Sequence, residues 1–237
     1  VGTAIHQAAV KVREKALTLA SKLLNTPKEE LELADGVVRV ADLPEQFISL
    51  GELAMRANPT RGTVEEGMEP GLEAASYYGP PHGATGYGCL GLILDVDPET
   101  GKVKIERLVI ADDCGTNINP MIVDGQIHGG LQMGIGEAFY ENLVYDDYGQ
   151  LVTASFMDYL FPQATDMPDK FEIKHIVTPS PLNPLGMKGI GEAGAICVPA
   201  CFMQALEDAF ENKDMDIKDS FMSPSKLYHS VQKVKGA

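Results

Sequence analysis

One carboxylate stands in the most glycine-rich segment of the chain, where the residue types suit chemistry close to the backbone. Residues 184–194 contain four glycines, and Glu192 lies among them, four positions after Lys188. Glycines leave backbone amides open to close approach by an anion or an oxygen-rich ligand. In a dry pocket of this kind, Glu192 would hold a proton more readily and could act as a general base near neutral pH. By composition alone, a surface loop with a solvated Glu and Lys is a somewhat more common explanation.

The same segment also matches, in form, the fingerprint of a dinucleotide-binding turn. Gly189, Gly191 and Gly194 have the spacing Gly-x-Gly-x-x-Gly, which predicts an alternative, a nicotinamide- or flavin-dinucleotide-binding oxidoreductase domain. In such domains the fingerprint directly follows a buried parallel strand. Here it follows a stretch with prolines at 179, 181 and 184, and the chain has no alternating series of strands and helices. The context therefore argues against this alternative.

A second glycine-rich segment has the periodicity of a helix. Residues 124–137 combine helical spacing of apolar residues with glycines four or five apart, so one side of the predicted helix is bare backbone. Another element packed against that side is the ordinary explanation, and we expect it for Gly130, Gly134 and Gly136. Near the N-terminal end, Gln126 could present its side-chain amide to a heterocycle or a phosphate, helped by the helix dipole.

Charge and composition exclude several classes of function. The formal net charge is −15, and the 19 basic residues are scattered among 34 acidic ones, so a nucleic-acid partner is not expected. The four cysteines lack Cys-x-x-Cys spacing and the five histidines never pair at ligand spacing, so we predict no metal ligand within this chain. No apolar run is long enough to span a membrane, which favours a cytoplasmic protein with reduced thiols.

Hydrophobic periodicity predicts an α+β fold of mixed and antiparallel sheets packed with helices. The predicted helices cover residues 3–24, 50–57, 120–141 and 198–210, and a last one begins at Ser223-Pro224. The predicted strands are two short ones around Gly36, a hairpin of 87–96 and 103–111, two near residues 144 and 151, and one at 171–177. Residues 58–85 form a predicted connector, so a helix-rich part, 1–75, would precede an α+β part, 76–237, that carries both glycine-rich segments.

Five short motifs occur together and in the same order as in a known family. They are Asp113-Cys114-Gly115 through Asn119-Pro120, residues 124–130, Met157-Asp158-Tyr159, Pro179-Ser180-Pro181 and residues 188–192. This series resembles the C-terminal third of molybdenum hydroxylase large subunits, the family of xanthine dehydrogenase and aldehyde oxidase. The sequences Met-Asp-Tyr and Pro-Leu-Gly-x-Lys-Gly-x-Gly-Glu are more similar to the aerobic carbon monoxide dehydrogenase subgroup. The resemblance covers nearly the whole chain and implies the molybdopterin-binding fold of that family.

The resemblance implies a role for each glycine-rich segment. Glu192 matches the family's active-site glutamate, which takes a proton from a hydroxylic ligand of the molybdenum centre. Metal coordination lowers the pKa of such a ligand, so a carboxylate suffices as the base. The positions that match cofactor-contacting residues are Asn119, Gly125, Gln126, Lys188, Gly189, Ile190 and Gly191. The metal itself would be held by the pyranopterin, and not by side chains of this chain.

The resemblance also implies a larger enzyme around this chain. The cofactor would be the molybdenum pyranopterin in its cytosine dinucleotide form, with iron–sulfur clusters and FAD on partner subunits. The substrate would be a small molecule such as carbon monoxide, an aldehyde or an N-heterocycle, oxidised with water as the oxygen source. Because the sequence begins almost inside a predicted helix, we expect a missing N-terminal molybdopterin-binding part, and no activity from this piece alone. A dimer of the heteromeric complex is expected, and a non-catalytic assembly domain is the remaining alternative.

Overall fold

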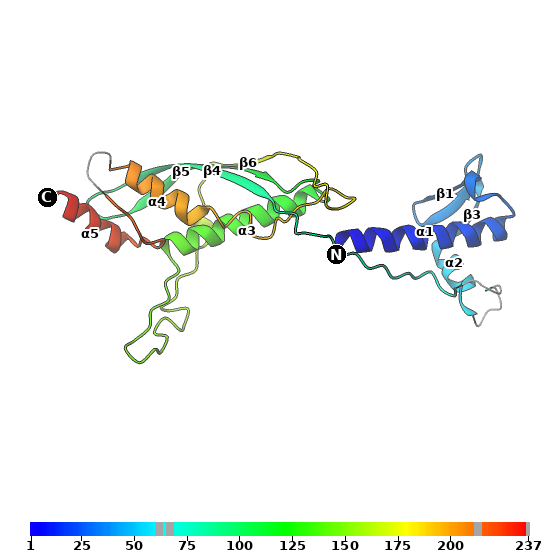
Figure 1. The fold of residues 1–237 in the computed structure, drawn as a ribbon, viewed down its shortest axis with the longest axis horizontal. Coiled ribbons are helices and arrows are strands. Elements are labelled where there is room, and N and C mark those ends of the chain that lie inside the picture. Colours follow the sequence, from blue (N-terminus) through cyan, green and yellow to red (C-terminus); the bar gives the residue numbers. More distant parts are fainter. Residues whose placement is uncertain (60–63, 65–68, 211–214, 236–237) are drawn as a thin grey trace. The chain divides into compact units, whose positions relative to one another are not determined.

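The chain divides into two compact units, each with its own apolar core. The computed structural model describes residues 1–59, 64, 69–210 and 215–235. The units are Val1–Pro80 and Pro81–Ala237, drawn in blue to cyan and in green to red respectively (Figure 1). The division falls inside the predicted connector of residues 58–85, five residues after the predicted boundary at residue 75, and part of that connector lies outside the described residues.

The first unit packs two helices against a small antiparallel sheet of order β1-β2-β3. Its elements are α1 (Gly2–Leu24), the 3-10 helix η1 (Lys28–Glu30), β1 (Leu31–Ala34), β2 (Val37–Val40), β3 (Leu43–Ser49) and α2 (Leu50–Arg56). The two predicted helices and the two strands around Gly36 are confirmed. The third strand was not predicted, because five of the seven residues of β3 are exposed and no alternation of apolar and polar residues marks it.

The second unit is built on a three-stranded mixed sheet of order β4-β5-β6. The long strands β4 (Tyr87–Val96) and β5 (Val103–Asp113) pair antiparallel, and β6 (Phe171–His175) pairs parallel with β5. The turn between β4 and β5 is held by Asp97, which accepts hydrogen bonds from the Glu99 amide at 2.9 Å and the Thr100 hydroxyl at 2.7 Å. The predicted hairpin and the α+β class are thus confirmed, while β6 ends at His175, two residues earlier than predicted.

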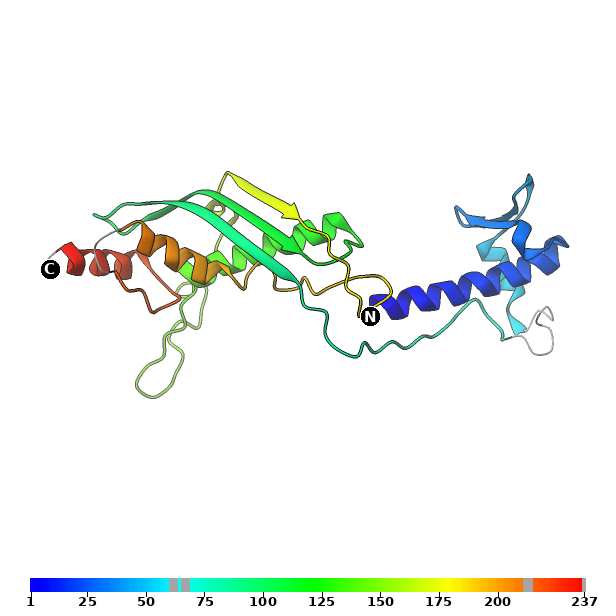
Figure 2. The ribbon, with the colours of Figure 1, turned by 45° about the horizontal axis from the view of Figure 1, so that its top comes forward.

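Helices cover one face of this sheet and bury the core between them. They are α3 (Pro120–Phe139), α4 (Val198–Asp208) and α5 (Pro224–Lys235), and the short 3-10 helix η3 (Ala164–Asp166) lies before β6. Both views show α3 and α4 running along the same side of β4 and β5 (Figures 1 and 2). Leu108 and Ile110 of β5 are fully buried against this layer, and Phe202 of α4 meets Phe139 of α3 edge to face, with 5.0 Å between ring centroids. The predicted helices at 120–141, 198–210 and after Ser223 are confirmed.

Residues 141–162 leave the end of α3 as a protruding arm (Figure 1). The two strands predicted near residues 144 and 151 are wrong, since this segment contains only an isolated bridge between Tyr145 and Leu151. Both residues belong to an exposed or half-exposed stretch, so no buried face stabilises a hairpin there. In the part of the chain that the structure describes, no helix is long and apolar enough to cross a membrane.

Candidate functional site

The N-terminus of α3 is fixed by a cap, which brings Gly125 and Gln126 into the second turn of the helix. The Asn119 side-chain oxygen accepts a hydrogen bond from the Ile122 amide at 3.2 Å, and Pro120 occupies the first helical position. Asn119 therefore caps the helix, a structural role that the sequence analysis did not predict beside its cofactor contact. Gly125 and Gln126 are both exposed, and a Cβ added to Gly125 would meet nothing within 4 Å.

The loop that carries the first glycine-rich segment is tied to the end of β5 by its backbone. The Lys188 amide donates to the Cys114 carbonyl at 2.8 Å, and the Gly189 amide donates to the Ala84 carbonyl at 2.9 Å. Asn183 closes the entry to the loop, because its side chain hydrogen-bonds both backbone groups of Met187. The amides of Lys188 and Gly189 thus donate to carbonyls of this chain. Only the backbone amides of the residues that follow could donate to a ligand, as the sequence analysis expected of this loop.

The Lys188 side chain turns away from the loop surface and forms a buried ion pair. Its ammonium lies 3.0 Å from a carboxylate oxygen of Asp113, and both side chains are less than a tenth exposed. Hydrogen bonds from Thr178 and from the Gly115 amide, together with the ammonium of Lys188, outweigh burial and hold the pKa of Asp113 well below its usual range. The pair anchors the loop to the sheet and keeps the Lys188 side chain buried, away from the hollows.

Gln126 joins the two glycine-rich segments. Its side-chain nitrogen donates to the Gly191 carbonyl at 2.6 Å, across 65 residues of sequence. Beside this contact lies a hollow of about 340 Å³, which Gln126, Gly191 and Glu192 help to line. A second hollow, of about 450 Å³, lies along residues 189–193 and Tyr87, and Glu192 borders it as well. The predicted site residues Gln126, Gly191 and Glu192 are therefore brought together by the fold.

The glycines of α3 fall into two groups, which the structure separates clearly. A Cβ on Gly130 would lie 2.8 Å from Gly194 Cα, and one on Gly134 would lie 2.5 Å from Val198 Cβ. Gly136 is equally close to the Glu141 side chain, so close packing on the three glycines is confirmed, but only at Gly134 is the partner another helix, α4, as predicted. By contrast, a Cβ on Gly129 or on Gly191 would meet nothing within 4 Å. Backbone around Glu192 therefore faces open space that the chain itself does not fill.

Glu192 lies on the rim of both hollows and is exposed. Among the described residues its carboxylate makes no hydrogen bond or ion pair, and the amides of Ile190, Gly191 and Glu192 donate to no carbonyl. The described residues of this chain do not enclose Glu192 in a dry pocket, since they leave its carboxylate in contact with solvent. Any enclosure of Glu192 must come from a ligand or from further protein.

Sequence reasoning missed a histidine close to this site. His175 Nδ1 lies 2.6 Å from Asp112 Oδ1, and His175 Nε2 lies 2.7 Å from Asp124 Oδ1. The three residues come from β6, β5 and α3, so no local spacing could reveal the cluster. The one signal in the sequence was the pair of acids at the end of a strand, which capping of a turn also explains. Within the described chain, no three His, Cys, Asp or Glu residues are placed to hold a metal ion.

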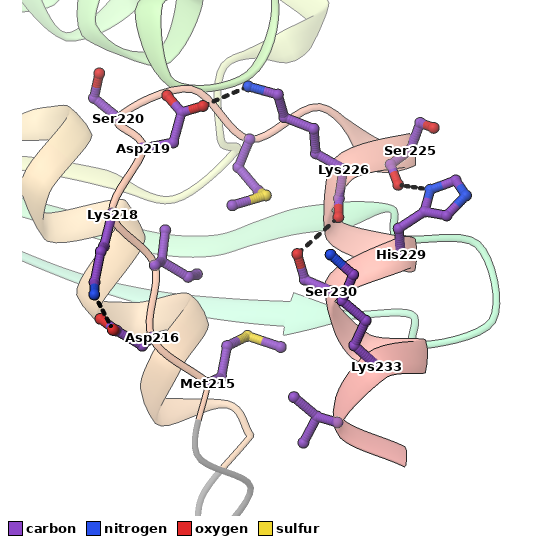
Figure 3. A pocket seen from close by; sticks show the side chains of 13 residues that line it. Met215, Asp216, Lys218, Asp219, Ser220, Ser225, Lys226, His229, Ser230 and Lys233 are labelled. Carbon is purple, nitrogen blue, oxygen red and sulfur yellow. Dashed lines mark hydrogen bonds and ion pairs between the residues drawn. The ribbon is translucent and has the colours of Figure 1, made fainter. Parts of the chain in front are cut away.

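A larger hollow, of about 1020 Å³, lies beside α5 and shares no residue with the glycine-rich site (Figure 3). Four of its charged side chains form two ion pairs, Lys226 with Asp219 and Lys218 with Asp216. His229 and Ser230 bond to carbonyls of their own helix. Of these interactions, the bonds of Lys226 to Asp219 and to the Phe221 carbonyl link α5 to the preceding segment.

Comparisons with known proteins agree with the resemblance inferred from the motifs. Residues 1–168 match a family described as a molybdopterin cofactor-binding domain. The carbon monoxide dehydrogenase large chain of Afipia carboxidovorans is 40% identical over 209 residues, which cover 88% of this chain and 25% of that protein. The nicotine 6-hydroxylase large subunit of Paenarthrobacter nicotinovorans is 36% identical over 231 residues, covering 98% and 28%. The chain thus spans about a quarter of the length of these relatives.

The fold leads to the same family. The structure of a reconstituted CO dehydrogenase from Oligotropha carboxidovorans superposes with a TM-score of 0.79 and 36% identity, over 99% of this chain and 29% of that one. The dinucleotide-binding alternative has no comparable support, because residues 189–194 lie in an irregular loop without a buried parallel strand leading directly into it. By sequence and by fold, the chain belongs to the molybdopterin cofactor-binding domain family and matches about a quarter of the length of large subunits such as that of carbon monoxide dehydrogenase.

Proposed function

We propose that this chain supplies one wall of the molybdenum pyranopterin site of a multi-subunit hydroxylase, with Glu192 as the active-site base. The observation that carries the proposal is the meeting of Gln126, the 188–192 loop and Glu192 around hollows that the chain leaves open. Glycine backbone at 129 and 191 faces this open space, so a ligand can approach the main chain without meeting a side chain. The arrangement fits a flat, polar cofactor.

Several groups are available to hold such a cofactor. The Gln126 side chain uses its nitrogen for Gly191, which leaves its carbonyl oxygen to accept from a ring N–H. The amides of Ile190 and Gly191 can donate to ring or phosphate oxygens of the cofactor, for which we propose the cytosine dinucleotide form. The backbone of Lys188 and Gly189, already bonded within the chain, would keep the loop in shape. The exposed N-terminal end of α3 at Gly125 adds a favourable dipole for an anionic group.

Glu192 would provide the proton transfer. When bound, the molybdenum centre supplies the redox chemistry and lowers the pKa of a hydroxylic ligand, so that a carboxylate can accept its proton. Glu192 sits on a loop that is fixed on both sides, by the Lys188 ion pair before it and by the Gly130–Gly194 contact after it. Such fixation holds a base at one position with little loss of freedom on reaction.

We further propose that the substrate is selected outside this chain. One relative is named for carbon monoxide and another for nicotine, an N-heterocycle, although both match nearly the same residues here. Because relatives with different substrates share this part of the large subunit, we propose that this chain holds the cofactor and the base. Residues outside this chain would then shape the substrate pocket.

The rest of the enzyme would comprise the remaining part of the large subunit, an iron–sulfur subunit and a FAD subunit, in a cytoplasmic complex that dimerises. The names of the relatives as a large chain and a large subunit support such an assembly. The protruding arm also supports it, because Phe156 and Met157 are more than four-fifths exposed and would be covered in a complex.

A pair of glutamine variants in the complete enzyme tests the proposal. Gln126→Ala removes the link to Gly191, whereas Gln132→Ala removes a glutamine of the same helix that bonds to the Pro162 carbonyl instead. We expect the first variant to purify with less molybdenum and pterin per large subunit, and the second to retain the parent's content. A parent complex without molybdenum and pterin would instead support the non-catalytic assembly role.

A further inference from the structure

His175 connects three elements of the second unit at the edge of the candidate site. It is the last residue of β6 and lies opposite Asp112 of β5 in the sheet register, while Asp124 reaches it from the first turns of α3. Its two ring nitrogens lie 2.6 Å from Asp112 and 2.7 Å from Asp124. The Asp112 side chain is 1% exposed, the His175 side chain 23% and the Asp124 side chain 48%. We refer to these three residues as the His175 bridge.

The two short contacts determine the charge state of the ring. A neutral imidazole carries one N–H, so it would turn a lone pair toward one of the two carboxylates, whereas the imidazolium donates to both. Burial alone would lower the pKa of His175, but the hydrogen bond to Asp124 and the charge of Asp112 outweigh it, so the pKa lies above its ordinary value. Asp112 Oδ2 is buried and has no partner among the described residues, so His175 is the counter-charge of this carboxylate.

The two aspartates of the His175 bridge lie close in sequence to the residues that hold the 188–192 loop, Gln126 and Asp113. Asp124 stands two residues before Gln126, whose amide holds the Gly191 carbonyl. Asp112 stands immediately before Asp113, which holds Lys188 of the loop. The bridge therefore fixes α3 to the sheet at the point where Gln126 must meet a loop that is itself anchored to the same strand.

We propose that His175 is a positioning residue, whose imidazolium holds the first turns of α3 on the sheet and thereby keeps Gln126 against the 188–192 loop. The inference rests on the proposed function, because the loop and Gln126 are there assigned to the cofactor. The charged groups that contact His175 are Asp112 from β5 and Asp124 from α3. Neither contact touches the cofactor-facing atoms of Gln126, so the effect of His175 is transmitted through the backbone of α3.

The sign of the pH dependence follows from the raised pKa. A group that binds its proton more tightly in the folded state stabilises that state below its unfolded pKa, about 6.5 for histidine, and the effect is lost as the pH rises through the folded value. We therefore expect the bridge to be intact below about pH 6.5 and to weaken as the pH rises through the raised pKa of His175. The α3 residues around Gly125 and Gln126 would then become mobile before the rest of the unit.

Hydrogen exchange of the complete enzyme tests the bridge independently of turnover. In the parent, amides 122–128 should exchange roughly tenfold faster at alkaline than at mildly acidic pH after correction for the intrinsic rate, because a hydrogen bond to a charged group is lost. His175→Gln should exchange at the fast rate at every pH and should lose molybdenum and pterin sooner on dialysis. His128→Gln, an exposed histidine of the same helix, should keep the parent's pH profile. If His175→Gln does not assemble, Asp124→Asn, which removes only the more exposed acceptor, should show an intermediate profile.

The outcomes separate this inference from the proposed function. Equal exchange and equal cofactor retention in His175→Gln and the parent, or a parent profile that is flat with pH, would overturn the role of His175. Pterin-free parent enzyme that still shows the alkaline rise in exchange would support the bridge as a mechanical link while removing the proposed function. An alkaline rise in exchange with unchanged cofactor retention would overturn the claim that the bridge acts on the cofactor site.

Discussion

Two neighbouring glycines of α3 provide a sharp test of how the helix supports the loop that carries Glu192. Gly129 and Gly130 share one helix and one residue type, but a Cβ on Gly129 meets open space and a Cβ on Gly130 meets the loop backbone. We consider Gly129→Ala and Gly130→Ala as a matched pair. Any difference between the two variants reports the contact with Gly194 and not the helical preference of alanine.

The magnitudes follow from the geometry. Alanine in place of glycine in a helix interior is worth about 1 kcal/mol, which Gly129→Ala should gain. The same gain applies to Gly130→Ala, but its Cβ would lie 2.8 Å from Gly194 Cα and 3.0 Å from the Gly194 carbonyl carbon. These are backbone atoms that cannot rotate aside, and overpacking of this kind costs about 1–3 kcal/mol. We expect Gly130→Ala to be less stable than Gly129→Ala by roughly 1–3 kcal/mol.

Urea unfolding of this chain, followed by circular dichroism, measures the difference directly. In the complete enzyme, Gly130→Ala should also reduce turnover. Displacement of Gly194 would move Glu192, which lies only two residues before it. Gly129→Ala borders the hollow without touching the loop, and serves as the control for stability. Equal free energies of unfolding for the two variants would refute the backbone contact between α3 and the loop.

Two further predictions concern the anchor of the loop and the core beneath it. Asp113→Asn should destabilise the chain above about pH 4 and progressively less as the pH falls. The lowered pKa of Asp113 adds stability at pH values above its pKa in the unfolded chain, and protonation removes that stability. Chemical unfolding over a range of acid pH measures this, and a constant difference in unfolding free energy between variant and parent would contradict it. Phe202→Ala, at a fully buried position, should cost about 3–5 kcal/mol in urea unfolding, and a cost near that of a surface substitution would show that α4 does not pack as described.

Much of the fold could be predicted because its periodic patterns are long. The 23 residues of α1 have an apolar and a polar face over several turns, the 20 residues of α3 keep helical spacing of apolar residues, and β4 and β5 are long strands around one clear turn. The strand β3 and the arm of residues 141–162 could not be predicted in the same way. Both are largely exposed, so the sequence carries no buried face to mark them.

The candidate site was predicted in part: the packing on the glycines of α3 was expected, but the polar partners of Lys188 and His175 were not. Glycine spacing alone indicated that something packs on α3, and the structure identifies the partners of Gly130 and Gly134 as Gly194 and Val198. The inward turn of Lys188 could not be read from its neighbours, because its partner Asp113 lies 75 residues away. His175 was missed for the same reason, since its two carboxylates are 63 and 51 residues distant. Long-range pairing of polar groups leaves no local period.

The most direct test of the central claim compares two glutamates of one hollow. Glu192 and Glu137 both line it and both are exposed, but only Glu192 is proposed as the base. In the complete enzyme with molybdenum and pterin content verified, Glu192→Gln should lower turnover about 10²- to 10⁴-fold, the usual range for loss of a general base, while Glu137→Gln stays close to the parent. A cofactor-replete Glu192→Gln enzyme that turned over like the parent would contradict the account.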